Sequence, residues 1–196
     1  MAKECVQLIR NVVFWLMCFG CAIINAQQLQ MAAQMQFTRF DAATNWQSSV
    51  GWRSETAVAL PENFRIGLQF GYQTTHEIFD IIGGTGKLAV ALLPLAIIAG
   101  CTFAKLPGNA SSEVLAAAGA VRLHRDAQQI DLGAIGETEI PAETNWHRQL
   151  QLGVRFRREF NRWGVQFGVQ SQWMKLQQTV QHWEITGGIH ANLFNL

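Results

Sequence analysis

Hydrophobic and small polar residues alternate strictly in two nine-residue stretches of the chain. In residues 162–170, one side carries Trp, Val, Phe and Val, and the other carries Gly, Gln, Gly and Gln. Residues 65–73 repeat the pattern, and the letters Arg, Gly, Gln, Phe, Gly and Gln coincide in register. Period-two alternation predicts β-strands with two unlike faces. Glycine and glutamine suit a narrow lumen and the bulky apolar face suits lipid, so the pattern predicts a transmembrane β-barrel.

Further segments predict strands along the chain after residue 27. With the two stretches above included, they are residues 28–40, 46–60, 64–75, 88–104, 114–124, 130–140, 149–157, 162–176 and 180–193. Single-chain barrels of this class have even strand numbers. Nine segments therefore include one wrong assignment, which we place in residues 88–104. We expect an all-β, closed, antiparallel up-and-down barrel of about eight strands, or ten if Pro94 divides that segment.

Residues 88–104 are apolar on both faces, which leaves strand and helix open. Seventeen helical residues would span about 26 Å, barely the thickness of a hydrocarbon core. Pro94 in the middle weakens a helix. In a strand, the same proline would mark a bulge or an edge of the sheet. The strand is favoured.

Residues 114–124 alternate more clearly, and one side is free of charge: Leu115, Ala117, Gly119, Val121 and Leu123.

The first 26 residues have the features of a secretory signal peptide. Lys3 and Arg10 provide a basic start, residues 12–24 are nearly all apolar, and Ala26 is a small residue at a plausible cleavage point. The alternative is a retained membrane anchor. We expect residues 1–26 to be the signal peptide and residues 27–196 to be the barrel domain.

Charge and cysteine content narrow the function classes. The segment 1–26 holds Lys3, Arg10 and Glu4, so 13 of the 15 basic and 13 of the 14 acidic side chains remain after it. A neutral chain implies no nucleic-acid partner. Of the four cysteines only Cys101 lies beyond the segment, which excludes a disulfide scaffold within the chain.

Tryptophan is frequent although tyrosine is almost absent. Tryptophan suits a membrane–water boundary, where its ring is half wetted. We expect five tryptophans to lie at such boundaries: Trp46, Trp146, Trp163, Trp173 and Trp183.

The patterns above resemble those of the small outer-membrane β-barrels of Gram-negative envelopes, the class that includes the membrane domain of OmpA. The resemblance covers most of residues 28–196 and is one of pattern. It implies an outer-membrane location, termini on the periplasmic side, and outer-membrane lipid as the surroundings. The class usually ends in an aromatic residue, whereas here Phe194 lies near the terminus and Leu196 is last.

Two groups of polar residues are candidates for function. His182, Glu184, His190 and Asn192 share the inward-type face of the last segment, where two histidines and a carboxylate suit a metal site or a base beside Ser171 or Ser49. The favoured alternative is a hydrogen-bonded network that fills the lumen. A second lumen polar cluster is predicted from Arg155, Arg157, Glu159, Gln166 and Gln170. No cofactor and no metal is expected.

Three functions remain open. The favoured one is a non-enzymatic outer-membrane barrel that acts as a structural or interaction protein or as a narrow pore. The second is a lipid-modifying barrel enzyme that resembles the outer-membrane deacylases and phospholipases. The third is a periplasmic β-sheet component of an envelope secretion or conjugation assembly, with an envelope protein as its partner.

Overall fold

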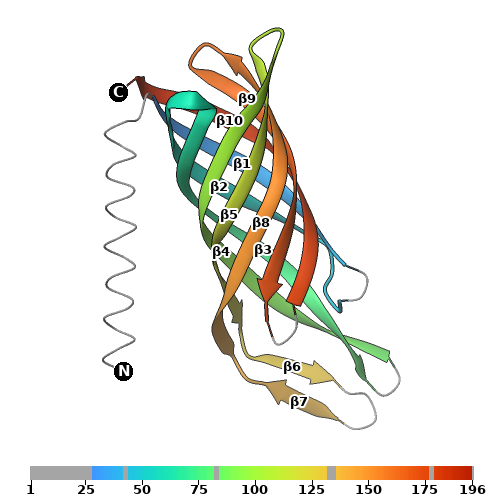
Figure 1. The fold of residues 1–196 in the computed structure, drawn as a ribbon. Helices are drawn as coiled ribbons and strands as arrows, with labels where there is room; N and C mark the ends of the chain where they lie inside the picture. Colours follow the sequence, from blue (N-terminus) through green and yellow to red (C-terminus); the bar gives the residue numbers. More distant parts are fainter. Residues whose placement is uncertain (1–27, 42–43, 82–83, 132–135, 177–178, 196) are drawn as a thin grey trace, which may run out of the picture.

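The computed structural model describes residues 28–41, 44–81, 84–131, 136–176 and 179–195 (Figure 1). The predicted signal peptide lies outside these residues. The elements are β1 (Gln28–Phe40), β2 (Ser49–Ala59), the short 3₁₀ helix η1 (Pro61–Asn63), β3 (Phe64–Ile81), β4 (Gly84–Leu106), β5 (Ala110–Arg125), β6 (Gln128–Asp131), β7 (Glu137–Ile140), β8 (Glu143–Phe160), β9 (Trp163–Lys175) and β10 (Thr179–Asn195). Within the described parts of the chain, no helix is long and apolar enough to cross a membrane.

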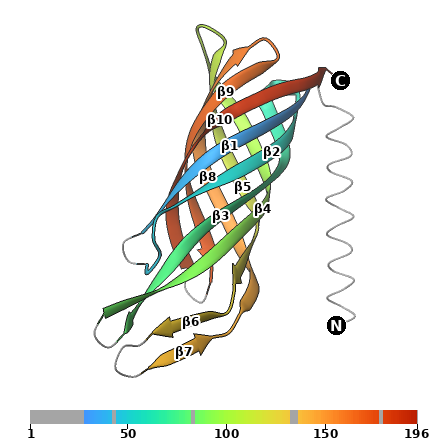
Figure 2. The same ribbon diagram turned by 180° about the vertical axis from the view of Figure 1, so that it is seen from behind.

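Eight of these strands close into an antiparallel barrel. The order around the ring is β1, β10, β9, β8, β5, β4, β3 and β2, and β1 pairs with both β10 and β2. Figure 2 shows β1 between these two neighbours. A closed ring pairs the backbone amides of every strand, which a hydrocarbon environment requires. The predicted closed, up-and-down barrel of eight strands is confirmed.

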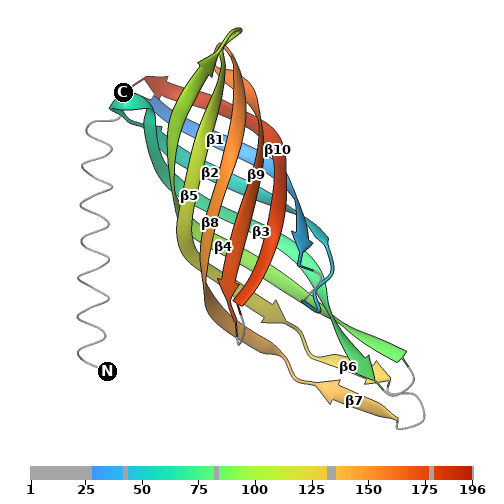
Figure 3. The ribbon, with the colours of Figure 1, turned by 45° about the vertical axis from the view of Figure 1, so that its right-hand side comes forward.

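The wrongly assigned segment is residues 130–140, and not residues 88–104. The chain around residues 130–140 forms the separate hairpin β6–β7, whose strands pair only with each other. Figure 3 shows this hairpin projecting from the barrel beside the tip of the β3–β4 hairpin, at the end away from the C-terminus. The single strand predicted there is wrong, because β6 ends at Asp131 and β7 begins at Glu137. Alternation also carries no information about the partner of a strand.

Residues 88–104 form the central part of β4, as the favoured interpretation predicted. Pro94 neither divides the strand nor marks an edge, because β4 pairs with β3 on one side and with β5 on the other. The pairing to β3 passes from Leu95 directly to Leu92, and it skips Pro94 and Leu93 without a register shift. The proline therefore lies at a local gap in one ladder, where its missing N–H is tolerated.

The outer surface of the barrel is apolar. The exposed side chains of β1, β3, β8 and β9 include Met35, Phe37, Leu68, Phe70, Leu150, Phe156, Phe167 and Val169. The glycines and glutamines that alternate with these residues point into the lumen and are buried. The two-faced pattern in the sequence therefore has the orientation that a lipid-facing barrel requires.

In the β4–β5 hairpin, apolar side chains also line the lumen. The uncharged side of β5, which carries Leu115, Ala117 and Val121, faces inward and is buried. On β4, Val90, Leu92, Ala96 and Ile98 do the same, while Leu95 faces outward. This side of the lumen is therefore apolar, which explains why residues 88–104 are apolar on both faces.

Candidate functional site in the barrel lumen

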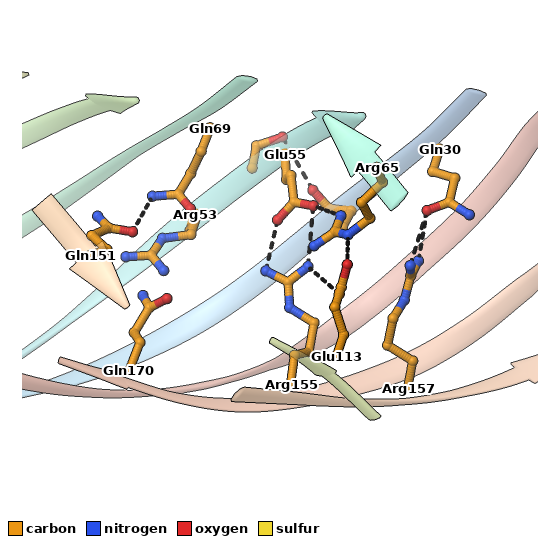
Figure 4. Close-up of polar contacts among 12 residues, drawn as sticks. Gln30, Arg53, Glu55, Arg65, Gln69, Glu113, Gln151, Arg155, Arg157 and Gln170 are labelled. Carbon is orange, nitrogen blue, oxygen red and sulfur yellow. Dashed lines mark hydrogen bonds and ion pairs between the residues drawn. The ribbon is translucent and has the colours of Figure 1, made fainter. Parts of the chain in front are cut away.

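Two arginines and two glutamates meet inside the barrel (Figure 4). We refer to Glu55, Arg65, Glu113 and Arg155 as the lumen ion cluster. Arg65 donates to both carboxylates. Arg155 donates from Nη2 to Oε2 of Glu55 at 2.8 Å and from Nη1 to Oε1 at 3.1 Å, and its Nη1 lies 4.0 Å from Oε2 of Glu113.

The lumen ion cluster is neutral and almost fully buried. Each of its four residues is at most 6% exposed. Buried charges are tolerated only where good geometry and hydrogen bonds offset their desolvation. The cluster joins β2, β3, β5 and β8, so it ties opposite walls of the barrel together. Gly100 on β4 leaves room for it, because a Cβ at this position would overlap the Glu113 carboxylate.

A second ion pair lies farther along the lumen. Arg53 on β2 donates to Oε2 of Glu184 on β10. Gln170 donates to the same oxygen, and Nε2 of His182 lies 3.4 Å from the other carboxylate oxygen. Glu184 is therefore held by a cation, an amide and an imidazole.

Glutamines also connect several strands across the lumen. Gln69 donates to Gln151 at 3.1 Å, Gln151 to Gln172 at 3.0 Å, and Gln172 to Gln149 at 2.7 Å. Such amide chains satisfy buried polar groups without adding charge. The glycine and glutamine side of residues 65–73 and 162–170 therefore lines a packed polar interior.

The lumen is apolar at the end away from the C-terminus. We call its buried cluster the lumen plug, and it consists of Phe40, Val90, Leu92, Val121, Met174 and Val180. Leu123 and Leu176 pack against it. The ring of His182 lies 4.8 Å from that of Phe40, so His182 marks the border between the plug and the polar interior. These apolar side chains pack against one another inside the barrel.

The histidines predicted on the last strand do not converge. His182 and His190 share the lumen face of β10, but eight residues of strand separate them by about 26 Å. Within ion-pair distance in the described chain, His190 has Glu159, with 4.0 Å between Nε2 and Oε1. Within the described chain, neither histidine forms a hydrogen bond with Ser49 or Ser171, and no three potential metal ligands gather.

The residues of the predicted lumen polar cluster have different positions. Arg155 belongs to the lumen ion cluster, and Gln170 binds Glu184. Gln166 is buried. Arg157 donates from both Nη atoms to Oε1 of Gln30 at 3.0 Å. Glu159 is half exposed and lies near the barrel mouth instead of in the interior.

The five predicted interface tryptophans also differ. Trp146, Trp163 and Trp183 are exposed on the outer surface, and Trp163 contacts the ring of Phe160 at 4.9 Å between centroids. Trp173 is partly buried. Trp46 packs against the lumen plug, with its ring 5.4 Å from that of Phe40. Its position therefore differs from the lipid boundary that the sequence predicted.

Sequence reasoning missed four charged residues of the interior: Arg53, Glu55, Arg65 and Glu113. Their position in the alternation was the available signal. Arg65 shares its side with the glycines and glutamines of residues 65–73, and Arg53 and Glu55 lie opposite Trp52. Glu113 shares its side with Leu115, but it precedes the predicted strand 114–124, so that side looked uncharged.

Comparison with known proteins gives structural matches alone. No family model and no curated protein matches the chain. Neisserial surface protein A aligns with a TM-score of 0.55 at 13% sequence identity, over 84% of this chain and 97% of that one. OprG, an outer membrane protein from Pseudomonas aeruginosa, aligns with a TM-score of 0.52 at 9% identity, over 86% and 97%. The chain thus has the fold of the outer-membrane β-barrel proteins, the class that its sequence resembles.

Proposed function

We propose that the protein is a sealed β-barrel of the Gram-negative outer membrane that serves as a structural or interaction protein. Its apolar outer surface and closed ring suit lipid, and the outer-membrane barrels that it matches in fold support the location. A soluble periplasmic sheet protein would gain nothing from large apolar side chains exposed on every wall.

The observation that carries the proposal is the filling of the lumen. The lumen plug closes one part of the interior, and the lumen ion cluster crosses the other. An ion that passed through would have to displace both. The structure therefore favours a sealed barrel over a narrow pore.

The projecting hairpins support a role in interaction. The β3–β4 tip and the β6–β7 hairpin extend from the barrel at the same end, away from the C-terminus (Figure 3). Glu137 and Glu139 on β7 are exposed. Since the class places termini in the periplasm, this end faces the cell exterior in our proposal. Loops that project from a rigid barrel are common sites of recognition.

Conductance tests the sealed barrel directly. In planar bilayers we expect the purified protein to give no steps above the lipid baseline. Leu92→Ser, which places a hydroxyl in the lumen plug, should admit water and raise the frequency of small conductance steps. Leu95→Ser on the outer face of the same strand is the matched control. Regular conductance by the unmodified protein would contradict the proposal.

Labelling of intact cells tests orientation and location. In a Cys101→Ser background, a membrane-impermeant maleimide should label Glu139→Cys on β7 but not Asn109→Cys in the β4–β5 turn. Heat-modifiable mobility of the outer-membrane fraction would report the folded barrel. Recovery of the protein in the periplasmic fraction without heat modifiability would instead favour the secretion-assembly alternative.

The lipid-modifying alternative depends on His182 and His190. Their separation along β10 places them in different environments, which argues against a catalytic site that both share. We expect His182→Ala and His190→Ala to leave the lipid profile of the envelope unchanged. Loss of a modified lipid species in either variant would restore the enzymatic hypothesis.

A further inference from the structure

A pocket of about 510 Å³ lies at the barrel mouth beside the start of β1. The turns at this end line it, together with the side chains of Arg65, Lys105, Ser111, Arg157 and Glu159. At the inner end of the pocket, Arg65 connects it to the lumen ion cluster. Because that cluster crosses the lumen, the pocket is a dead end and has the form of a binding site.

Arg157 is an unbalanced charge in this pocket. It is only 9% exposed, and both Nη atoms are directed to the neutral amide oxygen of Gln30. Its Nε has no hydrogen-bond partner in the described structure. Among the described residues, no carboxylate lies within ion-pair distance of Arg157, whereas Arg53, Arg65 and Arg155 each contact at least one glutamate.

The other charged lining groups leave the pocket with a net positive charge. The two arginines and two glutamates of the lumen ion cluster cancel, which leaves Arg157 and Lys105 against Glu159. Glu159 is half exposed and lies 4.0 Å from His190. The Nη2 atom of Arg65 is also buried without a partner. Buried guanidinium donors without an acceptor are costly, and a bound anion would satisfy them.

We propose that this pocket binds the phosphate group of a small organic phosphate, with Arg157 as the principal contact and Lys105 at the rim. A guanidinium presents paired N–H donors that match phosphate oxygens, and lysine adds a point charge. The hydroxyl of Ser111 offers a further donor. The volume of the pocket exceeds that of inorganic phosphate, so the phosphate carries a second group. The polar residues that line the pocket suit a polar group there, such as glycerol. Its source is either a phospholipid headgroup or a soluble phosphate ester.

Binding to the full chain in maltoside micelles, which contain no phosphate, tests the proposal. Calorimetric titration with sn-glycerol 3-phosphate at low salt should show saturable binding, and glycerol should show none. Arg157→Gln should weaken the binding at least about tenfold, in line with the loss of a charge-assisted hydrogen bond. Arg158→Gln is the matched control, because its guanidinium lies outside over the ring of Phe160.

A second probe identifies the source of the phosphate. Dihexanoyl phosphatidylglycerol replaces sn-glycerol 3-phosphate in the same titration. Tighter, Arg157-dependent binding of the lipid assigns a headgroup, and tighter binding of the soluble ester assigns a free ligand. Heat-modifiable mobility checks that Arg157→Gln folds, and Lys105→Gln replaces it if it does not. Absence of saturable binding by both probes, or equal weakening by Arg157→Gln and Arg158→Gln, would overturn the proposal.

Discussion

The polar part of the lumen and the lumen plug fill the same barrel with different kinds of interaction. In the polar part, Glu55 accepts hydrogen bonds from two arginines that reach it from other strands. In the plug, Leu92 and Met174 are buried by nondirectional contacts. Removal of a charge leaves its partner uncompensated in a dry interior, whereas removal of an apolar group leaves a cavity. The stability of the polar part therefore depends on the pairing of charges, and the stability of the plug depends on how completely its side chains fill the space.

The largest effect is expected at Glu55. Glu55→Gln removes the charge that balances Arg65 and Arg155, so we expect a loss of about 3–5 kcal/mol in the free energy of unfolding. Urea unfolding in lipid vesicles, followed by tryptophan fluorescence, measures it. Glu139→Gln on the exposed β7 is the control and should change stability by less than about 0.5 kcal/mol. Equal stability of both variants would show that pairing does not hold the polar part together.

Leu92→Ala tests the plug. It should cost about 2–5 kcal/mol by the same measurement, since it combines lost apolar transfer with a cavity. Leu95→Ala on the same strand is the matched control, because Leu95 is 51% exposed on the outer surface and lipid can fill the space. A larger loss at Leu95 would mean that the outer surface, and not the plug, determines stability here.

A glycine substitution should show how tightly the polar part is packed. At Gly100 an added methyl group would displace the Glu113 carboxylate and crowd Nε of Arg65. Overpacking of this kind typically costs about 1–3 kcal/mol. At Gly187 on β10 nothing lies within 4 Å of such a group, so Gly187→Ala should be close to neutral. Thermal unfolding of the two variants checks the difference, which would vanish if the ion cluster were loosely packed.

The smallest effect concerns the independence of the two parts. Among the described residues, Glu55 and Leu92 share no partner, so the losses in Glu55→Gln/Leu92→Ala should add within about 0.5 kcal/mol. A double-mutant cycle measures this. A coupling above about 1 kcal/mol would show that the polar part and the plug respond as one unit, with His182 as the obvious connection.

The sequence predicted the strands of the barrel and their two faces better than the contacts between side chains in the lumen. Alternation assigned the faces of β1, β3, β8 and β9, since lipid and lumen impose unlike demands on neighbouring residues. It did not reveal that residues 130–140 pair outside the ring. Which strands pair with one another depends on the closed topology. The alternation within a single strand does not show this topology.

The contacts inside the lumen could not be predicted for a related reason. Glu55 and Arg155 are a hundred residues apart and meet because the ring brings β2 and β8 to opposite walls. The inward apolar side of β5 resembles a lipid-facing side, because a dry lumen and lipid select the same residues. Arg157 was predicted to lie in a lumen cluster, but its lack of a carboxylate is visible only in three dimensions.

Pairing of β1 with β10 has a consequence for biogenesis. The first strand has one permanent neighbour nearby in sequence, and the other arrives about 150 residues later. Before the ring closes, β1 and β10 each have an edge of unpaired backbone groups, and many apolar side chains are uncovered. Until both ends are present, such a chain is exposed to aggregation through its open strand edges and its apolar side chains.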